Sequence, residues 1–245
     1  PGSTEIMVGA SLEVVAEVRT PEKKAYPATL YVAVDGQKQE EVLAIIGTIG
    51  TAGGTGCVIE FTGEAITALS MEGRMTVCNM SIECGARAGL IAPDNVTLEY
   101  LRDRQHSPAG ERWDAAVRHW ESFRTDPGAS YDREVPVDLD TLGPMVTWGT
   151  NPGQGVEIGG RIPAIDQIPE SEKDAARQAL AYTKLEEGSE VEGVPVQWAF
   201  VGSCTNGRIE DLRIAAQILR GRRIAAGVTC YIVPGSESVM AQAEK

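Results

Sequence analysis

The alternation of strand-like runs with helical runs is the feature that most restricts the fold of this 245-residue chain. Each β-rich run ends at turn-forming residues and gives way to apolar residues at helical spacing. We expect strands at residues 29–36, 57–61, 135–139, 145–148, 194–201 and 228–233. We expect helices at residues 3–18, 40–49, 63–69, 71–90, 95–103, 170–184, 210–221 and 236–245, with an exposed helix and its loops at 105–132. The order predicts an α/β fold with mostly parallel sheets.

The polar linker near Pro127–Glu134 divides the chain into two consecutive three-layer α/β units of typical domain size. We expect residues 1–25 to be the tail of a preceding α/β domain. Residues 26–134 then form the first domain, and 135–245 form a second, incomplete one. Sites in such sheets lie at the carboxyl ends of strands. The turns Trp148–Asn151 and Ser203–Asn206 are expected at two such ends.

Charge and cysteine content restrict the partners and the compartment. The formal net charge of −13 argues against a nucleic-acid partner, although a few arginines still allow an anionic substrate. No run approaches the roughly 18–20 apolar residues of a membrane span, and no signal segment is recognisable. The five cysteines include no Cys-x-x-Cys pair, so neither a disulfide framework nor a complete zinc site is indicated. We therefore expect a cytoplasmic protein without membrane or nucleic-acid partners.

Cys204 lies in the turn between a predicted strand and a predicted helix, within Phe200–Leu212. The N-terminus of a helix favours negative charge, and so a thiolate is stabilised there. Gly202 and Gly207 let the backbone approach whatever the sulfur holds. The spacing alone still favours a buried cysteine in a turn over a ligand or nucleophile.

Glu83 is the carboxylate that stands out in the predicted helix 71–90, because small and apolar residues surround it. Asn79 lies four residues earlier, and both side chains would share one helix face. An apolar setting is costly for a carboxylate unless it is paired or used. A structural pair with Arg87, four residues later, is an equally good interpretation.

Three further features have weaker functional signals. The glycine-rich loop Gly50–Gly56 precedes a strand and lacks a Gly-Lys-Ser/Thr ending, so packing against a neighbour is favoured over phosphate binding. The amide-rich turn after Trp148 is either an anion site or an ordinary tight turn. His106 and His119 have no ligand partners at suitable spacing, and both are expected on the surface.

Six motifs together resemble the large, catalytic subunits of the 3-isopropylmalate dehydratase family, in the aconitase superfamily. They occur in the family's order and span nearly the whole chain, which makes the resemblance specific. The motifs are Gly50–Gly56 with Val58–Phe61, Leu69–Met75, Cys78–Glu83 with Gly85–Gly89, Val146–Gly153, Gly202–Asp211 and Val233–Ser236. The resemblance implies an aconitase-like fold.

The resemblance also implies roles for three residues. Cys204 looks like one of three cysteines that ligate a [4Fe–4S] cluster, Glu83 like the active-site glutamate, and Asn79 like its partner amide. An iron with open positions acts as a Lewis acid on the hydroxyl and carboxylate of the substrate. A desolvated, protonated glutamate then helps the hydroxyl leave as water. The implied reaction converts 2-isopropylmalate to 3-isopropylmalate by dehydration and rehydration, in leucine biosynthesis. A separate small subunit would complete the pocket for this small dicarboxylic hydroxy acid.

The chain also departs from the family. An upstream Gly-Asp-Ser-His-Thr segment and the downstream Cys-x-x-Cys that supplies the other two ligands are not in this sequence. We therefore expect a chain truncated at both ends, with an absent or incomplete cluster and no activity by itself. The alternatives are a homoaconitase or a citramalate/dimethylmalate hydratase subunit, and a cluster-free scaffold without catalysis.

Overall fold

The computed structural model describes residues 28–35, 41–138, 144–202 and 205–245. The chain forms two compact units, Pro1–Val191 and Glu192–Lys245. The expected helix at 3–18 lies outside the described residues. The predicted domain boundary near residue 134 remains a prediction.

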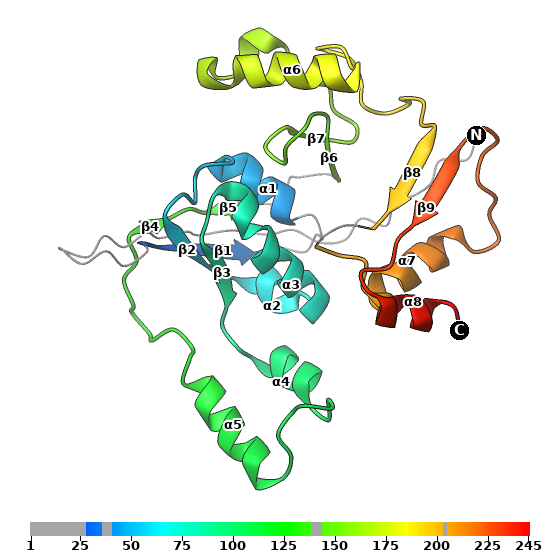
Figure 1. Ribbon diagram of the computed structural model, residues 1–245. Coiled ribbons are helices and arrows are strands. Elements are labelled where there is room, and N and C mark those ends of the chain that lie inside the picture. The colour runs from blue at the N-terminus through cyan, green and yellow to red at the C-terminus, as the bar shows by residue number, and fades with distance from the viewer. Residues whose placement is uncertain (1–27, 36–40, 139–143, 203–204) are drawn as a thin grey trace. The chain divides into compact units, whose positions relative to one another are not determined.

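A parallel sheet forms the centre of the first unit (Figure 1). Its strands occur in the order β3-β2-β1-β4, and β5 pairs with the other end of β1. All the pairings are parallel, with Ala28 opposite Cys57 and Val58 opposite Ala88. The strands are β1 (Ala28–Asp35), β2 (Cys57–Thr62), β3 (Ala88–Ile91), β4 (Arg133–Glu134) and β5 (Val137–Asp138). The α/β class with mostly parallel sheets is confirmed.

Four helical segments lie between β1 and β3 in the described part of the chain. Helix α1 joins β1 to β2, and the other three lie between β2 and β3 (Figure 1). They are α1 (Glu41–Ile49), α2 (Glu64–Ala68), α3 (Met71–Met80) and the 3₁₀ helix η1 (Ser81–Cys84). Ser70 caps α3, because its hydroxyl accepts a hydrogen bond from Gly73 N at 3.3 Å.

The hydrophobic core of this unit lies between β2 and its helices. Alternate residues of β2 are buried, as expected for a strand with one face on the core. The fully buried side chains include Ile46, Ile59, Ile66 and Val77. Burying each of them stabilises the fold by about 1.5–3 kcal/mol.

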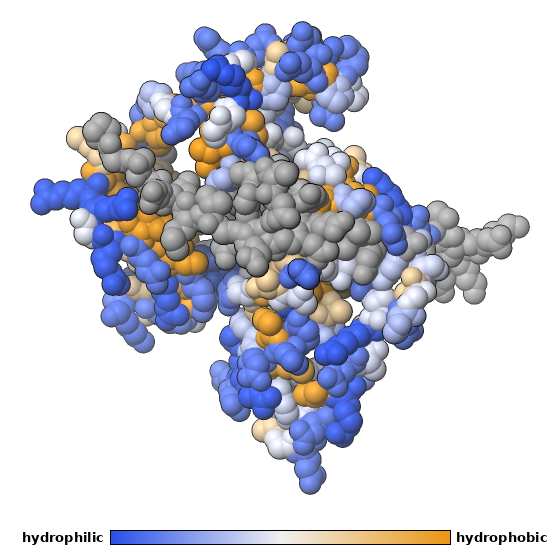
Figure 2. Space-filling view, turned by 180° about the vertical axis from the view of Figure 1, so that it is seen from behind, coloured by the Kyte–Doolittle hydropathy of each residue, from blue (hydrophilic) through white to orange (hydrophobic). Residues whose placement is uncertain are grey.

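The remaining elements of the first unit lie after β3. Helix α4 (Asn95–Leu101) begins at Asp94, whose carboxylate accepts from Thr97 N at 3.2 Å. Helix α5 (Glu111–Glu121) buries no residue, and Figure 2 shows apolar atoms exposed among hydrophilic ones in this region. The other elements are β6 (Met145–Thr147), β7 (Gly155–Glu157), the 3₁₀ helices η2 (Ile165–Gln167) and η3 (Glu170–Glu172), and α6 (Lys173–Thr183).

The described residues of the second unit form two parallel strands and two helices. These are β8 (Trp198–Val201), α7 (Ile209–Leu219), β9 (Thr229–Ile232) and α8 (Glu237–Ala243). Trp198, Phe200 and Tyr231 are more than half exposed on the strands, and Trp198 stacks on Tyr231 with ring centroids 5.6 Å apart. Hydrophobic surface is visible over this unit in Figure 2.

Two expectations about helices and strands were wrong. The predicted helix 71–90 ends at Met80, continues as η1 and turns into strand β3. Gly85 causes the change, because its left-handed φ of 84° ends the helical run. Second, β6 pairs antiparallel with β7. The turn after Trp148 is therefore the loop of a short hairpin and not the carboxyl end of a parallel strand.

Candidate active site

Asn79 and Glu83 lie on consecutive turns, in the last turn of α3 and in η1. Both side chains are exposed. The four-residue spacing therefore spans the junction of an α-helix with a 3₁₀ helix, and not a single helix face as expected. The neighbouring Ile82 is 64% exposed. The apolar, desolvated surroundings expected for Glu83 are thus not supplied by the described residues.

Arg87 is not the partner of Glu83 in the part of the chain that the structure describes. It precedes β3 and its backbone N–H donates to Cys57 O at 2.8 Å. Both side chains are exposed, and the described residues show no ion pair between them. The structural pair considered from the sequence is therefore not formed, and Glu83 remains available for chemistry.

Hydrogen bonds fix the backbone around Glu83. Gly85 N donates to Ile82 O at 2.9 Å, and Ala86 N donates to Ser81 O at 3.2 Å. Gly54 N, in the glycine-rich loop, donates to Cys84 O at 2.8 Å. A turn with its polar groups satisfied holds one conformation. Ile82 and Glu83 are therefore presented to solvent from a fixed base.

The glycine-rich loop Gly50–Gly56 packs closely against this turn. A Cβ on Gly54 would lie 3.1 Å from both Ala86 Cβ and Cys84 O, and one on Gly85 would lie 2.7 Å from Thr55 Oγ1. These approaches explain why glycines are needed here. The prediction that this loop packs its backbone against a neighbour is confirmed.

The hairpin turn 148–154 lies against the same loop. A Cβ on Gly153 would be 2.8 Å from Thr51 Cγ2. The turn uses its donors internally, because Thr150 N donates to Gln154 Oε1 at 2.6 Å and Gly153 N to Asn151 Oδ1 at 2.9 Å. These bonds favour the ordinary tight turn over an anion site. The glycine-rich loop thus contacts both the turn that carries Glu83 and the hairpin turn, and we take the surface around Asn79 and Glu83 as the candidate active site of this unit.

Arg74 is a buried residue that the sequence interpretation did not single out. It is 3% exposed and forms a bidentate pair with Asp94, at 2.6 and 2.8 Å. It also donates to Leu69 O at 3.1 Å and to Thr67 O at 2.8 Å. The available signal was an arginine between apolar residues of a helix, which requires a partner. This pair joins the start of α4 to α3, the helix that carries Asn79.

Cys204 and Ser203 lie outside the described residues. The described glycines on either side of them, Gly202 and Gly207, contact the segment that follows β9. Gly235 N donates to Gly207 O at 2.7 Å, and a Cβ on Gly202 would lie 2.6 Å from Val233 O. Asp211 caps α7, because its carboxylate accepts from the backbone N–H groups of Gly207 and Arg208 at 2.9 and 2.8 Å.

Three of the described cysteines, Cys57, Cys78 and Cys84, are poorly suited to ligate an iron–sulfur cluster. Cys57 and Cys84 are buried, and their thiols donate to the carbonyls of Thr55 and Ser81. Burial raises the pKa of both thiols, and it raises the pKa of Cys78 to about 11. Cluster ligands are thiolates, so these positions disfavour ligation. No group of three or more potential metal ligands occurs among the described residues.

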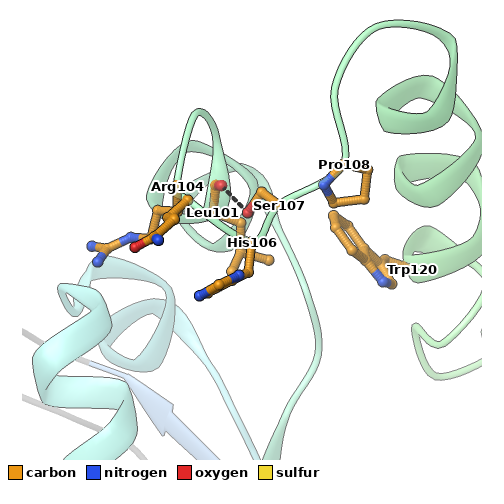
Figure 3. Close-up of a pocket in the computed structure, with 7 residues that line it drawn as sticks. Leu101, Arg104, His106, Ser107, Pro108 and Trp120 are labelled. Atoms are coloured by element: carbon orange, nitrogen blue, oxygen red, sulfur yellow. Dashed lines mark hydrogen bonds between the residues drawn. The ribbon is translucent and has the colours of Figure 1, made fainter.

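A separate pocket lies between the turn after α4 and helix α5 (Figure 3). It is lined by Leu101, Arg104, Gln105, His106, Ser107, Pro108 and Trp120. Ser107 Oγ donates to Leu101 O at 2.5 Å and fixes the turn. His106 and His119 are both exposed, as expected. None of the predicted site residues lines this pocket, so it is distinct from the candidate active site.

No described helix is long and apolar enough to cross a bilayer.

The chain belongs to the aconitase family: the model of the aconitase family (aconitate hydratase) matches residues 14–245. A curated relative is the 3-isopropylmalate dehydratase large subunit of Mycobacteroides abscessus, which is 54% identical over 223 residues. The match covers 88% of this chain and 46% of that protein. The chain therefore spans about half the length of the relative.

Proposed function

We propose that this chain is part of the large subunit of a 3-isopropylmalate dehydratase, which isomerises 2-isopropylmalate to 3-isopropylmalate by removing and adding water. The observation that carries the proposal is Glu83, exposed and unpaired among the described residues, on a turn whose backbone is fixed by hydrogen bonds. The 54% identity to a large subunit of that name supports the same reaction.

Glu83 would act as the general acid and base at the hydroxyl group that leaves as water. Its exposure in this chain supports direct access by the substrate, and desolvation would come from residues outside the described ones. A carboxyl group within hydrogen-bond reach can transfer the proton, which contributes about 10²–10⁴-fold to rate. Asn79, one turn earlier, would orient the substrate through its amide.

Cys204 would be one ligand of a [4Fe–4S] cluster in the whole protein. When bound, such a cluster supplies a Lewis-acid iron for the substrate hydroxyl. Its place in the sequence supports this assignment, because α7 begins five residues after Cys204 and Asp211 accepts hydrogen bonds from Gly207 N and Arg208 N just before the helix. The remaining ligands would come from outside this sequence.

A small subunit would be the partner, and a small hydroxy dicarboxylic acid would be the substrate. The words "large subunit" in the name of the relative support a second chain. The free thiols of the described cysteines fit a reducing, cytoplasmic compartment.

The test is a Glu83→Gln variant of the whole protein, assayed with its small subunit on 2-isopropylmalate. We expect kcat to fall by about 10²–10⁴-fold, because the amide cannot transfer the proton. Glu99→Gln is the matched control, since Glu99 is 70% exposed and pairs only loosely with Arg102; its kcat should change less than about two-fold. Wild-type turnover by Glu83→Gln would contradict the assigned role.

Comparison of kcat/KM on homologous hydroxy acids separates this function from homoaconitase and citramalate/dimethylmalate hydratase. Inactivity on all of these acids favours a scaffold without catalysis.

A further inference from the structure

The contact between α3 and β3 depends on Gly89, the second residue of the strand. A Cβ at this position would lie 2.1 Å from Ser81 Oγ, and 2.9 Å from both Cys78 Cα and Cys78 O. Carbon atoms do not approach so closely without displacing their neighbours. The last turn of α3 and the start of η1 therefore rest directly on the backbone of β3.

Ser81 is the residue of the turn that makes this contact, and it is fixed in several directions. It is 2% exposed, and its hydroxyl donates to Val77 O at 3.1 Å. Its carbonyl accepts from Ala86 N at 3.2 Å and from Cys84 Sγ at 2.9 Å. Ser81 lies two residues after Asn79 and two before Glu83. Any displacement of Ser81 is thus transmitted to both proposed active-site residues.

We propose that Gly89 and Ser81 are positioning residues for Glu83, an inference that rests on the proposed function. Because Gly89 has no side chain, the η1 turn can lie close to β3, and Ser81 is the residue of the turn that contacts Gly89. The exposed Glu83 has no partner of its own among the described residues, so its placement depends on the backbone below it. A shift of about 1 Å in a reacting group lowers a rate by about a hundred-fold.

The experiment substitutes Gly89→Ala in the whole protein with its small subunit. We expect kcat to fall by about ten- to a hundred-fold while KM changes by less than about three-fold, because binding contacts remain and only the reacting group moves. Gly47→Ala is the matched control: a Cβ there has no heavy atom within 4 Å. Its kcat should stay within about two-fold of the wild type. An unchanged kcat in Gly89→Ala overturns the proposal.

A double-mutant cycle with Glu83→Gln tests whether Gly89 acts through Glu83. If it does, Gly89→Ala should lower the residual kcat of Glu83→Gln by less than about two-fold, because the group to be positioned is already lost. Equal losses in both backgrounds overturn the proposal. If the wild type has no dehydratase activity, or Glu83→Gln is fully active, the proposed function fails instead.

Ser81→Ala provides the rescue. It removes the hydroxyl that a Cβ on Gly89 would meet at 2.1 Å and leaves the 2.9 Å contacts with Cys78. The kcat of the Ser81→Ala/Gly89→Ala variant should be at least three-fold higher than the kcat of Gly89→Ala. Absence of recovery overturns the role of Ser81. If Gly89→Ala alone fails to fold, the Ser81→Ala/Gly89→Ala variant takes its place in the cycle with Glu83→Gln. The loss of kcat that it causes should then again be smaller in the Glu83→Gln background than in the wild type.

Discussion

Replacing Arg74 by methionine is expected to loosen the connection between α3 and α4. Methionine keeps most of the length of the side chain but none of its donors. The substitution leaves the Asp94 carboxylate without its bidentate partner, and it leaves the carbonyls of Thr67 and Leu69 without the donors at 2.8 and 3.1 Å. Helix α3, which carries Asn79, therefore loses its side-chain connection to Asp94 at the start of α4.

The size of the effect follows from burial. Arg74 is 3% exposed and the side chain of Asp94 is 28% exposed. Breaking a buried pair costs about 3–5 kcal/mol, and the partial exposure of Asp94 places this one at about 3 kcal/mol. Because each 1.4 kcal/mol is a factor of ten, local opening of α3 and α4 should become about a hundred-fold more frequent.

Amide hydrogen exchange of peptides from α3 and α4, in the whole protein, measures this opening directly. Protection should fall about a hundred-fold in Arg74→Met and change little in β2. Arg102→Met is the control, because the side chains of its ion pair with Glu99 are 50% and 70% exposed, and such surface pairs contribute about 0–1 kcal/mol. Equal protection in Arg74→Met and the wild type would refute the reasoning.

Further predictions concern pH, a thiol and two turns. Burial alone would raise the pKa of Asp94, but the hydrogen bonds and charge of Arg74, with backbone N–H groups at the start of α4, hold it below its ordinary value. The stabilisation is therefore present above about pH 4 and lost as the pH falls through the lower folded-state pKa, so acid should lower α4 protection more in the wild type than in Arg74→Met, where only the backbone hydrogen bonds remain. With a pKa of about 11 against an ordinary 9.0, Cys78 should react with iodoacetamide at pH 8 about a hundred-fold more slowly in the folded protein than in urea, as peptide mapping would show. Asp211→Ala removes the acceptor of two N–H groups and should destabilise α7 by about 1 kcal/mol, read as faster amide exchange there; unchanged exchange would count against the cap. Gly202→Ala places a Cβ 2.6 Å from Val233 O at a φ of 149°, and should disturb β8 and β9 more than Gly221→Ala, which meets no neighbour, by the same exchange measurement.

The sequence predicted most elements correctly where periodicity and turn signals agreed. The alternation in β2 and the helical spacing in α1 both correspond to buried faces in the structure. The surface positions of His106 and His119 also followed from their isolation. In these places local pattern and tertiary packing favour the same structure, which is why the residues alone were sufficient.

The sequence misled where a single glycine changed the chain direction. Residues 81–90 resemble a continuation of α3, because small and apolar residues suit a helix as well as a buried strand. Gly85 ends the run with a left-handed φ, and Gly89 is a strand residue with α3 lying against it. Neither fact follows from composition, since a glycine inside a helical pattern only weakens it. The spacing of Asn79 and Glu83 was thus informative about adjacency but not about the helix type.

The same glycines connect the fold to the proposed chemistry. A carboxylate that transfers protons must be accessible to substrate and must also be fixed, and an exposed side chain has few contacts that can fix it. In this chain the contacts are made one layer below, by Ser81 on Gly89 and by Cys84 on Gly54. We therefore infer that the motifs Gly50–Gly56 and Gly85–Gly89 hold the backbone beneath the proposed site and do not themselves form it. This explains why glycine-rich segments with no phosphate-binding signature lie on either side of Glu83.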